Sequence, residues 1–159
     1  MRICLGIDPG LARVGYGAVA QTDTGLFPVC YGCIETFPNM TFTERLMKIY
    51  SDLQGKLSVI RPDFVAIERL FFGRNTTTAE YVWQARGVIM LLTAQNALPV
   101  AEFTPNNIKR KFCGSGKAGK HEIQTAIRDI LTLDEIPRPD DTADALAAAV
   151  AGLSYCEGR

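Results

Sequence analysis

The first part of the chain alternates short apolar runs with turn residues. Residues 2–8 form a mostly apolar run that is closed by Asp8-Pro9-Gly10, and residues 14–20 and 29–36 form two further runs of similar character. Apolar runs of this length, bounded by turn residues, predict buried strands. Because only short segments separate the three runs, we expect three antiparallel neighbours.

The hydrophobic period then changes from that of a strand to that of a helix. Apolar side chains recur at helical spacing from Phe42 to Leu57. Thr41 and Glu44 stand at the separation of a capping box, in which each side chain bonds the backbone of the other residue. The pattern predicts a helix that ends before Pro62.

Strands and helices alternate in the rest of the chain. Residues 64–67 are an apolar run too short for a helix, which predicts a buried strand that stops at Glu68. The elements expected after it are a helix from Asn75 or Thr76 to about Gln95, a strand at 98–103, an N-cap and N1 pair at Thr104-Pro105, a helix around 123–131 and a last helix from about Asp140. Antiparallel strands followed by alternating strands and helices predict an α/β fold, a mixed five-stranded sheet flanked by helices, as a single domain over residues 1–159.

Composition narrows the class of protein. The chain has 159 residues, of which 47% are hydrophobic and 21% are charged, a balance typical of one globular domain with a real core. No segment holds the ~18 consecutive apolar residues that a membrane helix needs, and residues 1–8 are too few for a signal-peptide core. We therefore expect no membrane association and a cytoplasmic location.

The five cysteines do not predict a disulfide framework or a zinc site. They are odd in number and widely scattered, so reduced thiols are expected. Cys30 and Cys33 have the spacing of a metal-binding pair, but they fall in a predicted strand, where residues three apart face opposite sides. Ordinary cysteines are favoured, since His121 is the single histidine.

Acidic residues end several of the predicted elements. Asp8 and Glu68 each close a strand, and Asp141 and Asp144, three apart, lie on one face of the last predicted helix. Taken singly, such an acid caps a helix or belongs to a turn. If the four converge, their mutual repulsion favours hard divalent cations such as Mg²⁺ or Mn²⁺, and two such ions perform phosphodiester hydrolysis.

The formal net charge is +0, but the basic residues are unevenly distributed. From Phe103 to His121 there is no acid, and five cations make a candidate phosphate-binding stripe: Lys109, Arg110, Lys111, Lys117 and Lys120. A second candidate DNA contact follows Glu68 and comprises Phe71, Phe72 and Arg74. The alternatives are a solvated loop for the stripe and core packing for the two phenylalanines.

An ordered set of motifs along nearly the whole chain is similar to one family. The motifs are Gly6-Ile-Asp8-Pro-Gly10, Gly15-Tyr-Gly17, Ala66-Ile-Glu68, Gln84-Ala-Arg-Gly87 and Asp141-Thr-Ala-Asp144-Ala-Leu-Ala. Together they resemble the RuvC Holliday-junction resolvases. The resemblance implies a ribonuclease-H-like fold, a homodimer, and Mg²⁺-dependent symmetrical nicking of four-way DNA junctions in recombination and repair.

The same resemblance assigns roles to particular residues. It carries Asp8, Glu68, Asp141 and Asp144 over as metal ligands, and Lys109, Lys120 and Phe71 as residues for activity or junction contact. It also implies RuvA and RuvB as partners. Our mechanistic hypothesis is that Asp8 bridges two ions, that Glu68 and Asp144 each hold one, and that Asp141 completes the set and helps to orient the attacking water. Asp140 is assigned the capping role.

Rival functions and the dimer surface remain open at this point. The rivals are a non-catalytic junction-binding module, a ribonuclease-H-like nuclease that acts on RNA–DNA hybrids, and an ATP-binding domain of the actin or sugar-kinase type. The last of these needs two domains around a cleft, and 159 residues make one. The predicted helix at 76–95 carries surplus apolar surface and is our candidate for the contact between two copies.

Overall fold

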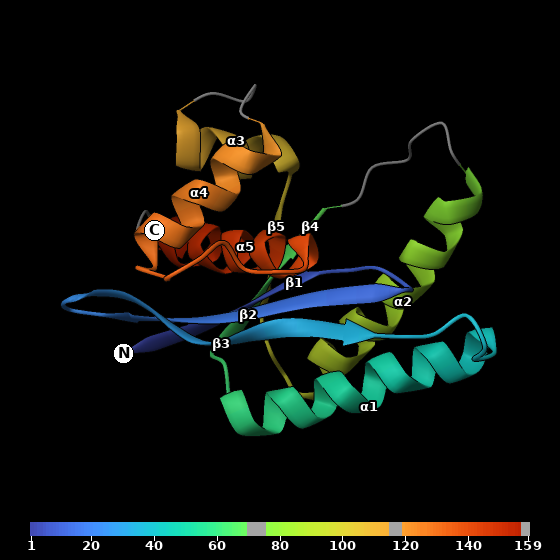
Figure 1. The fold of residues 1–159 in the computed structure, drawn as a ribbon. Coiled ribbons are helices and arrows are strands. Elements are labelled where there is room, and N and C mark those ends of the chain that lie inside the picture. Colours follow the sequence, from blue (N-terminus) through green and yellow to red (C-terminus); the bar gives the residue numbers. More distant parts are fainter. Residues whose placement is uncertain (70–75, 115–118, 157–159) are drawn as a thin grey trace.

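One five-stranded mixed sheet organises the molecule. The computed structural model describes residues 1–69, 76–114 and 119–156, and its strand order is β3-β2-β1-β4-β5. The strands are β1 (Arg2–Asp8), β2 (Arg13–Thr22), β3 (Gly25–Glu35), β4 (Phe64–Glu68) and β5 (Val100–Phe103). β1, β2 and β3 pair antiparallel, whereas β4 and β5 join β1 in parallel, so the expected mixed sheet with three antiparallel neighbours is confirmed (Figure 1).

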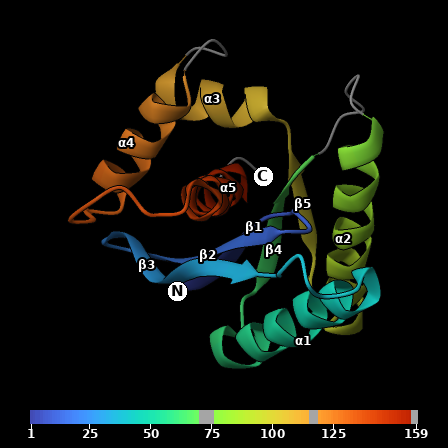
Figure 2. The same cartoon turned by 45° about the vertical axis from the view of Figure 1, so that its right-hand side comes forward.

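Helices cover both faces of this sheet. The helices are α1 (Phe42–Ile60), α2 (Thr76–Gln95), α3 (Pro105–Cys113), α4 (Lys120–Ile130) and α5 (Asp140–Cys156). α1 and α2 lie on one face, and α5, with α3 and α4 outside it, lies on the other (Figure 2). Each face has its own apolar core, one beneath α5 and one beneath α1 and α2. Within the described ranges, no helix has the length and apolar character to cross a membrane.

The capping residues predicted for two helices make the expected hydrogen bonds. The Thr41 hydroxyl accepts from the Glu44 backbone N–H, and the Glu44 carboxylate accepts from the Thr41 backbone N–H, so the capping box that begins α1 is confirmed. Thr104 caps α3 in the same way, with Pro105 as its first residue. The left-handed Arg61 ends α1 directly before Pro62, because the residue before a proline disfavours helical backbone.

Several strand boundaries differ from the sequence prediction, and β2, expected at 14–20, runs from Arg13 to Thr22. β3 begins at Gly25 rather than at residue 29, because it forms a hairpin with β2 in which Gly25 adopts a positive φ opposite Thr22. The register between β2 and β3 shifts at Val29, where Ala18 pairs with Cys30 and Val19 pairs with Pro28. This bulge interrupts the alternation of side chains, and the segment before it was therefore missed. β5 starts two residues later than predicted, at Val100.

α5 approaches the sheet unusually closely, because glycines replace side chains beneath it. A Cβ atom at Gly6 would lie 1.9 Å from the Ala145 carbonyl oxygen, and a Cβ at Gly15 would lie 1.9 Å from the Asp141 carbonyl oxygen. The facing side of α5 also carries small residues: five of the residues from 143 to 149 are alanines, and all five are buried. Backbone therefore packs on backbone, and this contact sets where the start of α5 stands over β1 and β2.

Candidate active site

The first two predicted acids lie side by side at one edge of the sheet. Ile7 of β1 pairs in parallel with Ile67 of β4, so Asp8 and Glu68, the next residue of each strand, end neighbouring strands at the same edge. Gly6, two positions before Asp8, faces α5, and strand positions two apart share a face. Asp8 and Glu68 therefore stand on the α5 side of the sheet, at the carboxyl ends of two parallel strands.

The start of α5 brings the other two acids to the same place. Asp8 pairs with Gly15 of β2, and Gly15 lies directly beneath the backbone of Asp141. Asp144 follows one helical turn later and lies close enough to Asp8 for its charge to raise the pKa of Asp8. The tight packing of α5 on glycine thus places two helix residues beside two strand residues from distant parts of the chain.

Electrostatics confirm that the four carboxylates share one environment. Burial is the largest of the causes that raise the pKa of Asp8 from 3.8 to about 8; the charges of Asp144, Glu68 and Asp141 also raise it, and Lys120 opposes them. Burial also raises the pKa of Asp144, although the hydrogen bond from Lys120 opposes this. A shift of this size on Asp8 means that the set strongly disfavours full ionisation without added positive charge.

Two side-chain cations flank the carboxylates. Lys120, the first residue of α4, places its Nζ 3.0 Å from Asp144 Oδ2 and 3.5 Å from Asp140 Oδ2. On the other side, Arg13 Nε lies 3.1 Å from Asp141 Oδ2. Each cation reaches the site from a different element, α4 for Lys120 and β2 for Arg13, and each pairs with a different acid of the cluster.

Asp140 and Asp141 occupy different environments, which decides between them. Asp141 lies over Gly15 and raises the pKa of Asp8, whereas the Asp140 side chain is half exposed and Lys120 beside it lowers the pKa of the Asp140 carboxyl. α5 begins at Asp140, and the capping role expected for this residue stays a prediction. The Asp140 carboxylate pairs with Lys120 and with Arg138, whose Nη1 lies 3.5 Å away.

The donor set fits a hard divalent cation. All four acids offer carboxylate oxygens, which Mg²⁺ and Mn²⁺ prefer, and the raised pKa of Asp8 indicates that the cluster lacks compensating positive charge. Across the residues that the structure describes, no three His, Cys, Asp or Glu side chains already stand in chelating positions. An ion would therefore have to draw these carboxylates closer together.

The predicted DNA-contact residues have mixed outcomes. Lys120 stands at the acidic cluster and half of its side chain is exposed, and Arg110 is exposed on α3. Lys109 and Lys111 belong to the same helix. Phe71, Phe72, Arg74 and Lys117 lie outside the described residues, so the structure does not test them.

Two residues near the cluster were missed by sequence reasoning. Arg13 and Cys33 face the α5 side because their strand positions align with Gly15: Arg13 precedes it by two residues and Cys33 is its partner on β3. Burial, and after it the charge of Asp141, raises the pKa of the Cys33 thiol to about 11. The only signal for either residue is the register of three strands, which the sequence does not state.

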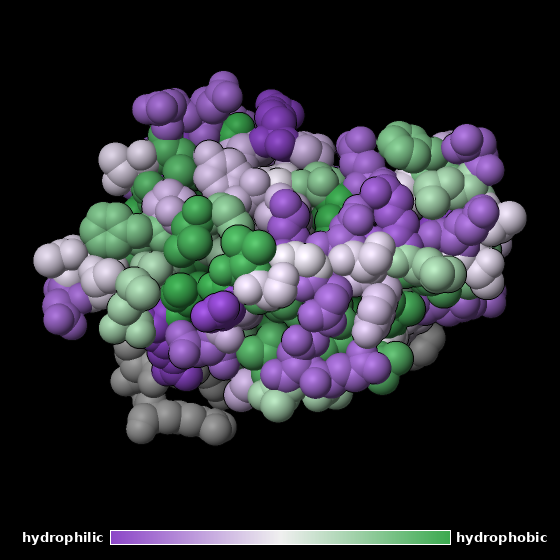
Figure 3. Space-filling model, turned by 90° about the horizontal axis from the view of Figure 1, so that it is seen from below, coloured by the Kyte–Doolittle hydropathy of each residue, from purple (hydrophilic) through white to green (hydrophobic). Residues whose placement is uncertain are grey.

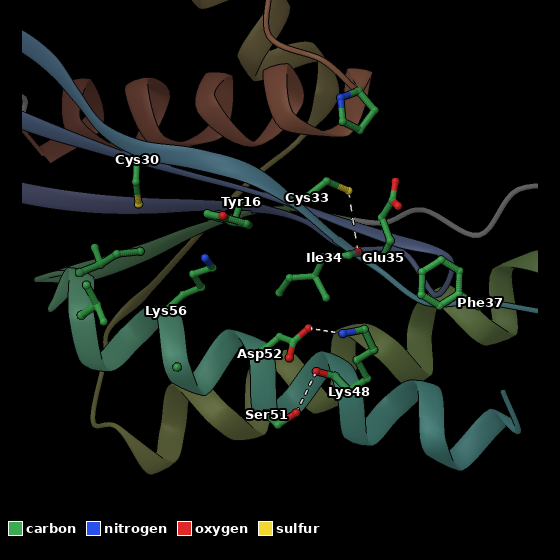
Figure 4. Close-up of a pocket in the computed structure, with 14 residues that line it drawn as sticks. Tyr16, Cys30, Cys33, Ile34, Glu35, Phe37, Lys48, Ser51, Asp52 and Lys56 are labelled. Carbon is green, nitrogen blue, oxygen red and sulfur yellow. Dashed lines mark hydrogen bonds and ion pairs between the residues drawn. The ribbon is translucent and has the colours of Figure 1, made fainter.

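A hollow outside this cluster lies on the other side of the sheet. It measures about 940 Å³ and lies mainly between β3 and α1, where Tyr16, Cys30, Lys48, Asp52 and Lys56 line it (Figure 4). Seen from below, hydrophobic side chains gather toward the end of the molecule at which the β2–β3 hairpin lies in Figure 1 (Figure 3). Cys30 and Cys33 pair with Ala18 and Gly15 respectively and so face opposite sides of the sheet, as predicted.

Comparison with known proteins agrees with this geometry. Residues 4–152 match the family model described as crossover junction endodeoxyribonuclease RuvC. A protein of that name from Desulfitobacterium hafniense (strain DSM 10664 / DCB-2) is 49% identical over 148 residues, which cover 93% of this chain and 90% of the relative.

Solved structures give the same picture. The structure described as T. thermophilus RuvC in complex with Holliday junction substrate superposes with a TM-score of 0.93 at 32% identity, over 99% of this chain and 96% of that one. The yeast mitochondrial Holliday junction resolvase Ydc2 has the same fold, with a TM-score of 0.71 at 13% identity over 96% of this chain and 78% of its own. The expected ribonuclease-H-like, mixed five-stranded architecture is confirmed, and the chain belongs to the family of crossover junction endodeoxyribonucleases named RuvC.

Proposed function

We propose that this protein resolves four-way DNA junctions by paired symmetrical nicks, through metal-dependent phosphodiester hydrolysis. Its family is that of the crossover junction endodeoxyribonucleases. The observation that carries the mechanism is the cluster of Asp8, Glu68, Asp141 and Asp144, in which burial and mutual repulsion raise the pKa of Asp8 to about 8. Four acids beside a DNA backbone would oppose binding unless cations occupied them.

The metal assignment follows from these donors. Asp8, Glu68, Asp141 and Asp144 would hold Mg²⁺, with two ions per subunit and Mn²⁺ as a substitute. Bound ions of this kind supply an activated water and stabilise the leaving oxygen of the phosphodiester. Asp8 is the central ligand, because it is the acid on which the charges of the other three converge.

Lys120 supplies the positive charge that the chain itself brings to the reaction. In the absence of a metal its ammonium pairs with Asp144 and Asp140, and half of its side chain is exposed. Once ions neutralise these acids, Lys120 is available to the phosphate of the strand being cut. Arg110, exposed on α3, extends the proposed DNA contact, and the basic residues Lys109, Lys111 and Lys117 together with Phe71, Phe72 and Arg74 are proposed for it from the sequence.

The proposed homodimer uses α2. One side of this helix packs in the core through Ala85, Ile89 and Leu92, whereas Tyr81 and Leu91 are exposed large apolar side chains on it. Two active sites related by a two-fold axis are what symmetrical nicking requires, and an isologous contact between α2 helices supplies that axis. Leu91→Asp should shift the protein toward monomer in sedimentation, and Val59→Asp on α1, at a position that is more exposed than Leu91, should not. A monomeric wild type at micromolar concentration contradicts the dimer.

The partners RuvA and RuvB are proposed from the family resemblance, and a single nuclease domain over residues 1–159 is proposed from the length and composition of the chain. A direct test of the partners is co-sedimentation of the three proteins on a synthetic junction. No complex beyond junction-bound subunits would argue against the pairing.

The central experiment compares substrates and metals. Purified protein is incubated with a labelled four-way junction, a matched duplex and an RNA–DNA hybrid, in Mg²⁺ or in EDTA, beside Asp8→Asn. Paired, metal-dependent nicks confined to the junction support the proposal, and Asp8→Asn should bind the junction without cutting it. Tight binding without nicks in any metal favours the junction-binding module, and cleavage of the hybrid favours a different nuclease.

A further inference from the structure

Arg13 reaches the active site from a strand that carries none of the acids. It is the first residue of β2 and pairs across the sheet with Glu35 of β3. Because Arg13 and Gly15 are two positions apart, they share a face, and Gly15 lies beneath Asp141. The side chain of Arg13 therefore points toward the start of α5, where its Nε lies 3.1 Å from Asp141 Oδ2.

The two partners of this ion pair differ in exposure. The Asp141 side chain is 25% exposed and its Oδ2 atom is buried, whereas the Arg13 side chain is 51% exposed. The guanidinium thus stands at the mouth of the cluster and contacts the inner oxygen of the acid. Asp141 lies in the first turn of α5, with its backbone packed on Gly15.

We propose that Arg13 is a positioning residue for the cleavage reaction. Its guanidinium engages one oxygen of Asp141, which leaves the other oxygen to act with Asp8 and Asp144 on a metal ion. The inference rests on the proposed function. Groups that orient a ligating carboxylate change metal affinity or activity by about 10- to 100-fold when they are removed, because the free ligand samples other rotamers.

Arg138 provides a matched control at the same end of α5. It is also an arginine, its side chain is 77% exposed, and its Nη1 lies 3.5 Å from Asp140 Oδ1 rather than from Asp141. An effect of positive charge near the helix start in general would appear in both Arg13→Ala and Arg138→Ala. An effect on Asp141 in particular would appear only in Arg13→Ala.

The experiment measures Mn²⁺ binding directly, by electron paramagnetic resonance of free Mn²⁺, and junction cleavage separately. The variants are Arg13→Ala, Arg13→Lys and Arg138→Ala, with unfolding in EDTA as the check that each one folds. We expect Arg13→Ala to weaken Mn²⁺ binding by about 10- to 100-fold and to lower kcat more than it raises KM for the junction. Arg13→Lys should recover part of the loss, since it keeps the charge but not the planar fork.

Three outcomes overturn the proposal. Mn²⁺ binding by Arg13→Ala that equals or exceeds that of the wild type means that Arg13 does not orient Asp141. Loss of junction affinity with unchanged Mn²⁺ binding makes Arg13 a DNA contact instead. An equal effect of Arg138→Ala makes the result one of general charge. A wild type that binds no Mn²⁺ contradicts the proposed metal site itself, which separates that failure from a failure of Arg13 alone.

Discussion

The two polar regions of this molecule, the acidic cluster at the start of α5 and the hollow between β3 and α1, differ in how their charges are balanced. In the hollow, Lys48 Nζ lies 2.7 Å from Asp52 Oδ2 on the same helix, and Lys56 Nζ lies 5.0 Å from the centre of the Tyr16 ring (Figure 4). In the cluster, four acids meet two flanking cations, and the pKa of Asp8 rises to about 8.

The difference shows why the hollow is not the better candidate for chemistry. An ion pair between neighbouring turns of an exposed helix is satisfied within its own element and contributes only a few tenths of a kcal/mol. The cluster gathers like charges from β1, β4 and α5, an arrangement that folding tolerates at a cost. Unbalanced charge gathered from distant segments indicates function more strongly than cavity volume does.

The same substitution in the two regions should have opposite consequences, and this is the largest effect we expect. Asp144→Asn should reduce junction cleavage to background, because it removes a charged ligand from the cluster, whereas Asp52→Asn should retain nearly full cleavage. Initial rates on a labelled junction measure both. Comparable losses in the two variants would remove the distinction between the regions.

The second largest effect should be a difference between the acidic cluster and the hollow in how their carboxylates make stability depend on pH. In the unfolded chain Asp8 ionises near its ordinary pKa of about 3.9, but in the folded metal-free protein its pKa is about 8. Between these values the folded state holds one more proton than the unfolded state, so the free energy of unfolding falls as pH rises, by up to about 1.4 kcal/mol per pH unit. Asp8→Asn in EDTA should flatten this dependence and exceed wild-type stability at pH 8.

Urea unfolding of both proteins from pH 5 to pH 8 provides the measurement. Asp52→Asn is the control, and its curve should follow that of the wild type. Parallel curves for wild type and Asp8→Asn would contradict a raised pKa for Asp8.

Glycine substitutions test the packing that positions the cluster. A Cβ at Gly6 would lie 1.9 Å from the Ala145 carbonyl oxygen and 2.6 Å from the Ala149 backbone nitrogen, and neither atom can move without moving α5. We expect Gly6→Ala to destabilise the protein by about 1–3 kcal/mol and to lower cleavage through displaced Asp141 and Asp144. Equilibrium unfolding checks the first effect, and an unchanged stability would mean that α5 is free to shift.

Substitution of Gly55 should have the smallest effect on stability, and its sign should be opposite to that of Gly6→Ala. It lies within α1, beside the hollow, and a Cβ there would meet no atom within 4 Å. Gly55→Ala should stabilise the protein by up to about 1 kcal/mol, because alanine loses less backbone entropy in a helix, and should leave cleavage unchanged. A destabilised Gly55→Ala would show that this region is also tightly packed.

Much of the fold could be predicted because local chemistry determines it. The Thr41 and Glu44 capping box, the Pro105 start of α3 and the apolar run that ends at Glu68 each depend on residues close in sequence, and each is confirmed. The early part of β3 was missed because the bulge at Val29 breaks the alternation on which strand prediction depends.

The four acids could be proposed from the sequence because each ends or begins an element, but their convergence could not be derived from that pattern. It depends on the parallel pairing of β1 with β4 and on the contact of α5 with Gly6 and Gly15. The choice of Asp141 over Asp140 as the acid directed at Asp8 depends on the same contact. The helix pattern alone leaves a rotation of α5 about its axis undetermined.

The sequence by itself determined the order of strands and helices, the chemical type of the site and the family motifs. Those properties follow from residue identity and spacing along one segment at a time. Only the tertiary structure decided which side chains flank the cluster, with Arg13 arriving from β2 and Lys120 from α4. The physical reason is that sheet register and backbone contact act between segments far apart in the chain, and no local pattern records them.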